Sequence, residues 1–406
     1  MKKLIIVPLF ALLCAAQPLV ACTSFIVSGK ATPDGKPLLF KNRDTDNLRN
    51  ALVAFNDGKY RYVGVVNSDS TWSSMVWGGY NETGFAIINT AAYNNNIGDT
   101  TKLADREGVL MKLALQCCRT LQDFERLLDT LRRPMGVDAN FGVIDAYGGA
   151  AYYETGNFRY VKFDANQAPG GIIIRTNYSE SYDRATGYGF CRFGTARQAI
   201  DEALAAKNLT PRFLFNSVAR SMKHALTHTD LLQSIPQSAE QPDFRFFTDY
   251  ISRHSTSSAM LIVGASSAAT ARSTAMWTAV GFPLTTAVVP IWLDARSSMP
   301  AAANMRPDTQ SPLCTAGLAL KESCFPLKHG NGRNYINLAV LVNQQRNGIM
   351  QQLNVLEDEV FKKASEVQAA LDRADRTADR MVADYYRWLD AHLSEGYRRL
   401  FGVELM

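Results

Sequence analysis

Cys22 lies where an apolar leader meets the first strand pattern of the chain, in the run Leu19-Val20-Ala21-Cys22-Thr23-Ser24-Phe25-Ile26-Val27. Lys2 and Lys3 give the leader a basic start, residues 4–16 are apolar, and small residues follow, which is the pattern of a secretion signal. The apolar run is shorter than the roughly 20 residues that span a membrane. The folded chain is therefore expected to begin near Cys22, with its first residues already in a strand.

A cysteine at this junction can carry its own base. Cleavage after Ala21 would give Cys22 a free α-amine beside its thiol. Only the thiolate attacks, and the pKa of a free thiol is about 8.5. An α-amine titrates near about 7.7–8.0, so it can take the thiol proton and return it to a leaving amine. Cys22 is thus a candidate nucleophile that needs no histidine.

The residues from Leu19 to Cys22 also form a lipobox. A lipoprotein would carry diacylglycerol on the Cys22 sulfur, which excludes a nucleophilic role, and the bulky Leu19 favours lipidation when the leader is considered alone. Cleavage near Ala15 or Ala16 is a further possibility, which would leave residues 17–21 as a propeptide for self-removal. Every alternative places the mature protein in the periplasm or at the cell surface, lipid-anchored if the lipobox is used.

Composition narrows the class of protein. With 406 residues and 47% hydrophobic content, the chain can bury a large core. Its net charge is +5, of which Lys2 and Lys3 contribute two, and the sequence has no basic block, so no nucleic-acid partner is expected. Export permits a disulfide between Cys314 and Cys324. The sequence has no Cys-x-x-Cys pattern, which argues against a zinc ribbon.

The order of local patterns predicts an α+β fold. Strands are expected at residues 23–28, 37–41, 60–66, 74–79, 85–89, 140–145, 150–154, 160–163, 171–176, 259–263, 275–280 and 286–291. Helices are expected at 105–118, at 121–132 behind a Thr120/Asp123 capping box, at 191–205 and after Pro211. This alternation of strands and helices suggests two sheets face to face between helical layers.

The C-terminal third differs in composition. Residues 296–332 belong to a stretch rich in Pro, Ala and Ser, which predicts a linker or wrapping loop. Residues 333–406 are almost wholly helical in pattern, with mixed charges typical of solvated helix faces. The predicted organisation is therefore a signal peptide at 1–21, a sandwich domain at 22–295, the linker at 296–332 and a C-terminal helical appendage at 333–406.

A set of short motifs resembles the N-terminal-nucleophile (Ntn) hydrolases, and within them the choloylglycine hydrolase and penicillin acyltransferase group. The motifs are CTSF at 22–25, LFKNRD at 39–44, NETGFAIIN at 81–89, NFGVID at 140–145, TN at 176–177, CRF at 191–193, MW at 276–277 and GFP at 281–283. The resemblance covers residues 22 to about 292 and does not include the C-terminal helices. It implies a four-layer αββα sandwich.

The resemblance also implies roles for five residues. Cys22 matches the nucleophile, and Asp44 matches the carboxylate that orients the α-amine and stabilises its charged form. Asn89 and Asn177 match the amides that flank the reacting carbonyl, where an N–H donor to the oxyanion is typically worth about 2.7–4 kcal/mol. Arg192 matches an arginine that orders the carboxylates and the nucleophile, with Arg197, one helical turn later, as its alternative.

The resemblance has one departure that bears on substrate. Choloylglycine hydrolases usually carry an arginine two or three residues before the aspartate, where this chain has Lys41 and Asn42. Arg43 is adjacent but is expected to point to the opposite face of the strand from Asp44. This departure argues against bile-salt or penicillin V substrates and favours the acyltransferase-like branch.

The implied activity is that of a secreted cysteine hydrolase that cleaves, or transfers the acyl group of, a linear non-peptide amide. A small-molecule amide is the expected partner, a homo-oligomer is possible, and no metal or organic cofactor is implied. The alternative is a lipoprotein lipidated at Cys22 that binds ligand on a decayed hydrolase fold. His224 and His228 have the spacing of a metal pair, but the glutamate and third ligand of a zinc protease are missing.

Overall fold

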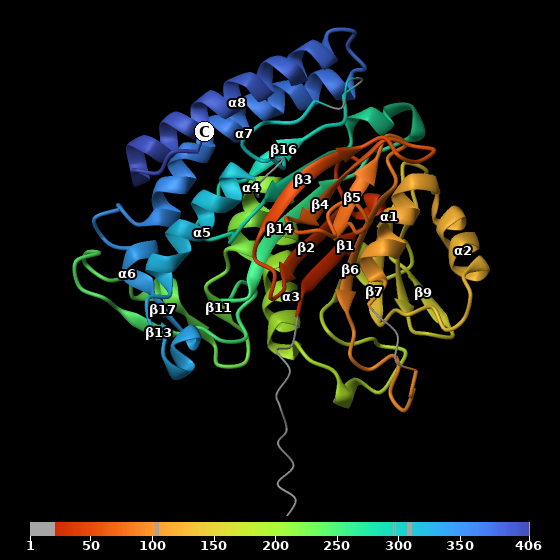
Figure 1. Cartoon of the computed structure of the whole chain (residues 1–406), viewed down its shortest axis with the longest axis horizontal. Coiled ribbons are helices and arrows are strands. Elements are labelled where there is room, and N and C mark those ends of the chain that lie inside the picture. The colour runs from red at the N-terminus through yellow and green to blue at the C-terminus, as the bar shows by residue number, and fades with distance from the viewer. Residues whose placement is uncertain (1–20, 102–104, 295, 297, 307–310, 406) are drawn as a thin grey trace, which may run out of the picture.

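The computed structural model describes residues 21–101, 105–294, 296, 298–306 and 311–405, so residues 1–20, which include Leu19 and Val20 of the lipobox, lie outside the described part. Two antiparallel sheets lie face to face, and helices cover the outer face of each (Figure 1). The expected four-layer αββα sandwich is confirmed.

The first sheet contains the strand that follows Cys22. Its order is β10-β1-β2-β14-β15-β16, with every neighbouring pair antiparallel. The strands are β1 (Thr23–Val27), β2 (Leu38–Asp44), β10 (Ile172–Arg175), β14 (Thr256–Val263), β15 (Ala275–Ala279) and β16 (Val289–Ile291). Because β1 lies between β10 and β2, Cys22 is placed at the end of an interior strand.

The second sheet is a seven-stranded meander. Its strands, in both chain and spatial order, are β3 (Asn50–Phe55), β4 (Tyr62–Asn67), β5 (Gly78–Asn81), β6 (Ala86–Ala91), β7 (Ala139–Ile144), β8 (Ala150–Thr155) and β9 (Tyr160–Asp164). β3 is a strand that no sequence pattern predicted. This strand lies at the edge of the sheet, where the main chain of Leu52 bonds with Ala303 and Met305.

Different helices cover the two outer faces. On the second sheet lie α1 (Glu107–Cys117) and α2 (Leu121–Thr130), which share a core with that sheet. The capping box of α2 is confirmed, since Thr120 and Asp123 each accept a hydrogen bond from the other's backbone N–H. On the first sheet lie α3 (Phe190–Ala205), α4 (Pro211–Leu214), α7 (Ile349–Asp372) and α8 (Ala378–Phe401).

The predicted linker at 296–332 contains a helix, α5 (Pro312–Cys324). The start signal was in the sequence, because the Ser311 side chain caps the helix and Pro312 occupies its first turn. The disulfide prediction is wrong as well: Cys314 and Cys324 are free and stand ten residues apart on this helix. Ten residues span about 15 Å of helix, whereas a disulfide joins Cα atoms about 4.4–6.8 Å apart.

The C-terminal helices share a core with the sandwich. Trp277 of β15 stacks on Phe361 of α7 with ring centroids 4.7 Å apart, and the Tyr397 hydroxyl of α8 accepts a hydrogen bond from the Ala287 amide. α8 ends at Gly402, whose positive φ of 64° suits a glycine C-cap. Among the described residues, no helix is both long enough and apolar enough to cross a membrane.

The remaining elements are short. Two small two-stranded sheets pair β11 (Lys223–His224) with β12 (Thr229–Asp230) and β13 (Phe244–Phe246) with β17 (Tyr335–Asn337). The short helices are η1 (Gly29–Ala31), η2 (Pro169–Gly171), η3 (Arg184–Thr186), η4 (Phe215–Ala219, a π-helix), η5 (Leu231–Gln233), η6 (Ala268–Ser273), η7 (Gly330–Asn334) and α6 (Leu338–Leu341).

Candidate active site

Cys22 is buried at one side of a cavity between the two sheets. Only 4% of Cys22 is exposed, and its Sγ lies 4.0 Å from the main-chain oxygen of Asp44. The cavity has a volume of about 480 Å³ and is lined by Cys22, Lys41, Arg43, Asp44, Thr45, Asn67, Trp77, Asn89, Ala91, Tyr93, Asp105, Glu107 and Asp138. The structure thus brings together three residues that the sequence analysis selected, namely Cys22, Asp44 and Asn89.

Asp44 is held by an arginine that the sequence analysis missed. Arg253 donates to Asp44 Oδ2 from Nε at 2.9 Å and from Nη2 at 2.6 Å, and the Thr256 hydroxyl donates to Oδ1. The same Arg253 Nη2 donates to the carbonyl oxygen of Ala21 at 3.0 Å. One guanidinium therefore contacts both the carboxylate and the peptide bond that joins Ala21 to Cys22.

Arg192 holds the main chain on the other side of Cys22. Its Nη1 donates to the Cys22 carbonyl oxygen and, at 3.0 Å, to the Thr23 hydroxyl, while its Nη2 donates to Asn177 Oδ1 at 2.7 Å. Burial, reinforced by the nearby charge of Arg253, lowers the pKa of Arg192 to about 10. Arg192 and Asn177 thus support the cysteine through its backbone, and neither is among the residues that line the cavity.

Arg197, the alternative to Arg192, is directed away from this cluster. Its side chain is 44% exposed and pairs with Asp201, one turn later on α3. The preference for Arg192 over Arg197 therefore agrees with the geometry.

Asn89 on β6 bridges two buried ionisable side chains, Lys41 and Glu107. Its Oδ1 accepts a hydrogen bond from Lys41 Nζ at 2.6 Å, and its Nδ2 donates to Glu107 Oε2 at 2.5 Å. These two bonds fix the orientation of the amide, because a lysine only donates. Burial raises the pKa of Glu107 well above its usual range, and the charge of Asp105 adds to this rise. An amide NH₂ has two hydrogens, so Asn89 has a second N–H to offer to a ligand.

Lys41 and Arg43 place two buried cations next to Cys22. Lys41 donates to Asn89 Oδ1 and to the Trp77 carbonyl, and Arg43 donates to the side-chain oxygens of Asn50 and Asn67. Burial lowers the pKa of Lys41 to about 8 and that of Arg43 to about 10, and in both cases the charge of Cys22 opposes this effect. The cavity therefore favours negative charge on a bound group.

Arg43 has the expected orientation on β2, yet it lines the cavity. The side chains of Arg43 and Asp44 leave β2 on opposite faces of the sheet. The cavity lies on the face from which Arg43 and Lys41 project. Lys41 pairs with Ser24 of β1, and Ser24 accepts a hydrogen bond from Tyr152 of the second sheet, so this face looks inward. Asp44, the last residue of β2, reaches the same cavity from the strand end. The two basic residues therefore share the cavity with the cysteine.

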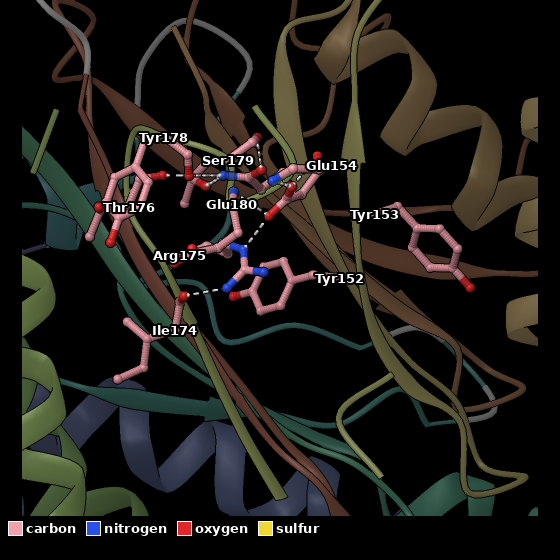
Figure 2. Close-up of polar contacts among 12 residues, drawn as sticks. Tyr152, Tyr153, Glu154, Ile174, Arg175, Thr176, Tyr178, Ser179 and Glu180 are labelled. Carbon is pink, nitrogen blue, oxygen red and sulfur yellow. Dashed lines mark hydrogen bonds and ion pairs between the residues drawn. The ribbon is translucent and has the colours of Figure 1, made fainter. Parts of the chain in front are cut away.

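The loop that carries Asn177 is anchored by a buried ion pair between the sheets (Figure 2). Arg175 Nε donates to Glu154 Oε1 at 2.8 Å, and the backbone amides of Glu180 and Ser181 donate to the two oxygens of Glu154, each at 2.8 Å. Asn140 adds bonds to this loop, because its Nδ2 donates to the Tyr178 carbonyl and its Oδ1 accepts from the Ser179 hydroxyl. Asn177 is thus fixed from both ends of its loop.

Other residues considered as candidates lie elsewhere. His224 and His228 belong to the small β11–β12 hairpin, and no group of three or more potential metal ligands occurs in the described part of the chain. Cys117 is exposed, while its neighbour Cys118 is buried. Arg253 and Glu107 carried no sequence signal. Arg253 becomes recognisable only when the pairing of β14 with β2 brings it to Asp44, and Glu107 only when α1 packs on the second sheet.

Comparison with known proteins gives structural neighbours only. No protein-family model matches the sequence, and no curated protein is significantly similar to it. Solved structures that are similar include an N-acylethanolamine-hydrolyzing acid amidase ortholog of Caenorhabditis elegans (TM-score 0.40, 14% identity, 60% of this chain and 92% of that chain). Two others are penicillin V acylase from Agrobacterium tumefaciens (TM-score 0.39, 16% identity, 67% and 86%) and a mutant of the conjugated bile acid hydrolase from Clostridium perfringens (TM-score 0.42, 11% identity, 71% and 98%).

Proposed function

We propose that this chain is an exported cysteine hydrolase that cleaves a linear, non-peptide amide, or transfers its acyl group, through an acyl-enzyme on Cys22. One observation carries the proposal. Cys22 lines a cavity, and Arg253 donates hydrogen bonds both to Asp44 and to the carbonyl of the Ala21–Cys22 peptide bond, which contains the nitrogen of Cys22. Removal of the residues before Cys22 would leave an α-amine at this place. A carboxylate nearby would stabilise its charged form.

The residues support a complete reaction. The α-amine takes the thiol proton, and the thiolate attacks the amide carbonyl carbon to form a tetrahedral oxyanion. In this proposal the second N–H of Asn89 and the charge of Lys41, which line the same cavity as Cys22, stabilise that negative charge. The C–N bond then breaks, the ammonium returns its proton to the leaving amine, and water or an acceptor amine releases the acyl group from sulfur.

The position of Cys22 disfavours the lipoprotein alternative. A lipidated cysteine needs a flexible tether that brings its sulfur to the membrane surface. Here Ala21 and Cys22 are both buried, and β1 begins at the next residue, in the interior of a sheet. The sulfur faces a cavity of about 480 Å³ shared with charged side chains, which is a poor environment for two acyl chains.

A substrate screen tests the proposal. The mature protein is incubated with N-acyl amino acids, bile-salt conjugates, acyl-homoserine lactones and penicillins, and release of free amine is measured. Hydrolysis or transfer of at least one linear amide, lost after alkylation of Cys22, supports the proposal. Turnover that survives alkylation of Cys22 contradicts it.

The lowered pKa of Lys41 predicts that kcat/KM falls at alkaline pH. Because burial lowers its pKa to about 8, Lys41 becomes neutral above this pH, and kcat/KM is expected to fall there. The α-amine acts as a base when it is neutral, so it produces a limb that rises with pH instead. In Lys41→Arg the falling limb should leave the range between about pH 7 and 10, since arginine stays charged. A falling limb near pH 8 that persists in Lys41→Arg would assign it to another group.

Arg192 and Arg197 form a matched pair for a test of positioning. Lys cannot reproduce the planar fork that joins the Cys22 carbonyl to Asn177, so Arg192→Lys should lower kcat by about 10- to 100-fold with little change in KM. Arg197→Lys, on the exposed face of the same helix, should change kcat by less than about twofold. Equal effects of the two substitutions would show that Arg192 does not position the nucleophile.

A further inference from the structure

A second cavity lies on the outer face of the first sheet, away from Cys22. It has a volume of about 640 Å³, and it is bordered by the turn before β2, the start of α4 and the middle of α7. Leu38, at the start of β2, lies in its floor, whereas Asp44 at the other end of β2 lies in the Cys22 cavity. Leu38 and Asp44 are six positions apart on this strand, which corresponds to roughly 20 Å. We call this second site the outer cavity.

The floor of the outer cavity is apolar and aromatic. Leu38 and Val263 are paired residues of β2 and β14, and Trp277 of β15 lies beside them. The Trp277 ring stacks on Phe361 at a centroid distance of 4.7 Å and an interplanar angle of 9°. The Arg212 guanidinium lies 5.3 Å from the Phe361 centroid and extends this stack to the rim. Such a surface suits a flat or chain-like apolar group.

The rim of the outer cavity is basic, with four cations and one carboxylate in its lining: Lys36, Lys207, Arg212, Lys362 and Asp34. Lys36 pairs with Asp372 at 2.7 Å, and Arg212 pairs with Asp358 at 2.5 Å. Lys362 makes only a loose, exposed contact of 3.7 Å with Glu359. Lys207 has no carboxylate partner among the residues that the structure describes. Lys207 and Lys362 are therefore free to bind an incoming anion.

We propose that the outer cavity binds a single-chain amphipathic carboxylate, a second binding site that is separate from the proposed active site. Its apolar chain would lie on Trp277 and Phe361, and its carboxylate at Lys207 and Lys362. The volume falls within the range of about 300–1,000 Å³ that is typical of small-molecule sites. The apolar floor provides the affinity and the basic rim selects the head group, so a cationic or neutral amphiphile of the same length should bind less well.

Quenching of tryptophan fluorescence tests this site without any need for turnover. The probe is ω-bromoundecanoate, whose bromine quenches a tryptophan that it contacts. We expect saturable quenching in the wild-type protein, equally in Cys22→Ala, and loss of most of that quenching in Trp277→Phe. The double variant Lys207→Glu/Lys362→Glu should raise Kd by about tenfold or more. Ser365→Phe, which places a ring in the cavity from α7, should abolish saturable quenching.

Head-group variants of the probe keep the test decisive even if the charge-reversed protein is unstable. With wild-type protein, ω-bromoundecanol and the corresponding trimethylammonium compound should each bind at least about tenfold more weakly than the carboxylate. Equal binding of all three would overturn the anion assignment. Absence of saturable quenching, or full quenching in Trp277→Phe, would overturn the site itself. Neither outcome depends on the proposed hydrolase activity.

Discussion

Replacement of Cys22 by alanine is expected to lower kcat by about 10⁵-fold or more on any amide that the mature protein cleaves. The nucleophile forms the acyl-enzyme. Removal of a nucleophile alone typically lowers kcat about as much as removal of all the catalytic residues that act together with it. Lys41, Arg43 and Asn89 would still line the cavity, so substrate binding should persist. The measurement is single-turnover and steady-state kinetics on the best substrate from the screen.

Cys117→Ala is the matched control for this prediction. Cys117 is an exposed thiol outside the cavity lining, and its hydrogen bond with Cys118 lowers its pKa. Its replacement should leave kcat within about twofold of the wild type, although it should reduce alkylation by thiol reagents. If Cys22→Ala kept more than about 1% of the wild-type kcat, the covalent mechanism would be wrong.

Glu357→Gln is expected to produce the largest loss of stability. Glu357 of α7 accepts bonds from both terminal nitrogens of Arg220, at 2.8 and 2.6 Å, and the two side chains are each only 1% exposed. The Val288 amide also donates to Glu357, so this carboxylate joins the C-terminal helix to the sandwich. Removal of one partner leaves a buried, uncompensated arginine, which typically costs about 3–5 kcal/mol.

The neighbouring residue supplies the control. Asp358, next to Glu357 on α7, pairs with Arg212, but its side chain is 61% exposed. Asp358→Asn should therefore lower the free energy of unfolding by no more than about 1 kcal/mol. Urea denaturation of both variants measures the difference. If the two substitutions had equal effects, the buried pair would not be what ties α7 to the first sheet.

Much of the fold could be predicted because it depends on local patterns. The Thr120/Asp123 box begins a helix wherever an amphipathic run follows it, and alternating apolar residues located most strands of both sheets to within a few residues. The juxtaposition of Cys22 with Asp44 also followed from short-range information, because β1 and β2 are neighbours in the chain.

What could not be predicted depends on long-range pairing. Arg253 is 209 residues from Asp44 in sequence and reaches it because β14, which follows Arg253, pairs with β2. Glu107 reaches Asn89 only when α1 packs on the second sheet. The position of Arg43 in the cavity could not be predicted, because the face of β2 that borders the cavity is set by the packing of one sheet on the other.

Intact-mass analysis and N-terminal sequencing of the exported protein, in parallel with an activity assay, test the central claim most directly. The claim is that the α-amine of Cys22 is the catalytic base, so a chain that retains Ala21 has an amide there and cannot use it. We predict that the active species begins at Cys22, carries no lipid, and exceeds the activity of a secreted variant with Ala21 retained by about 10³-fold or more. A diacylated Cys22, or full activity with Ala21 still attached, would contradict the account.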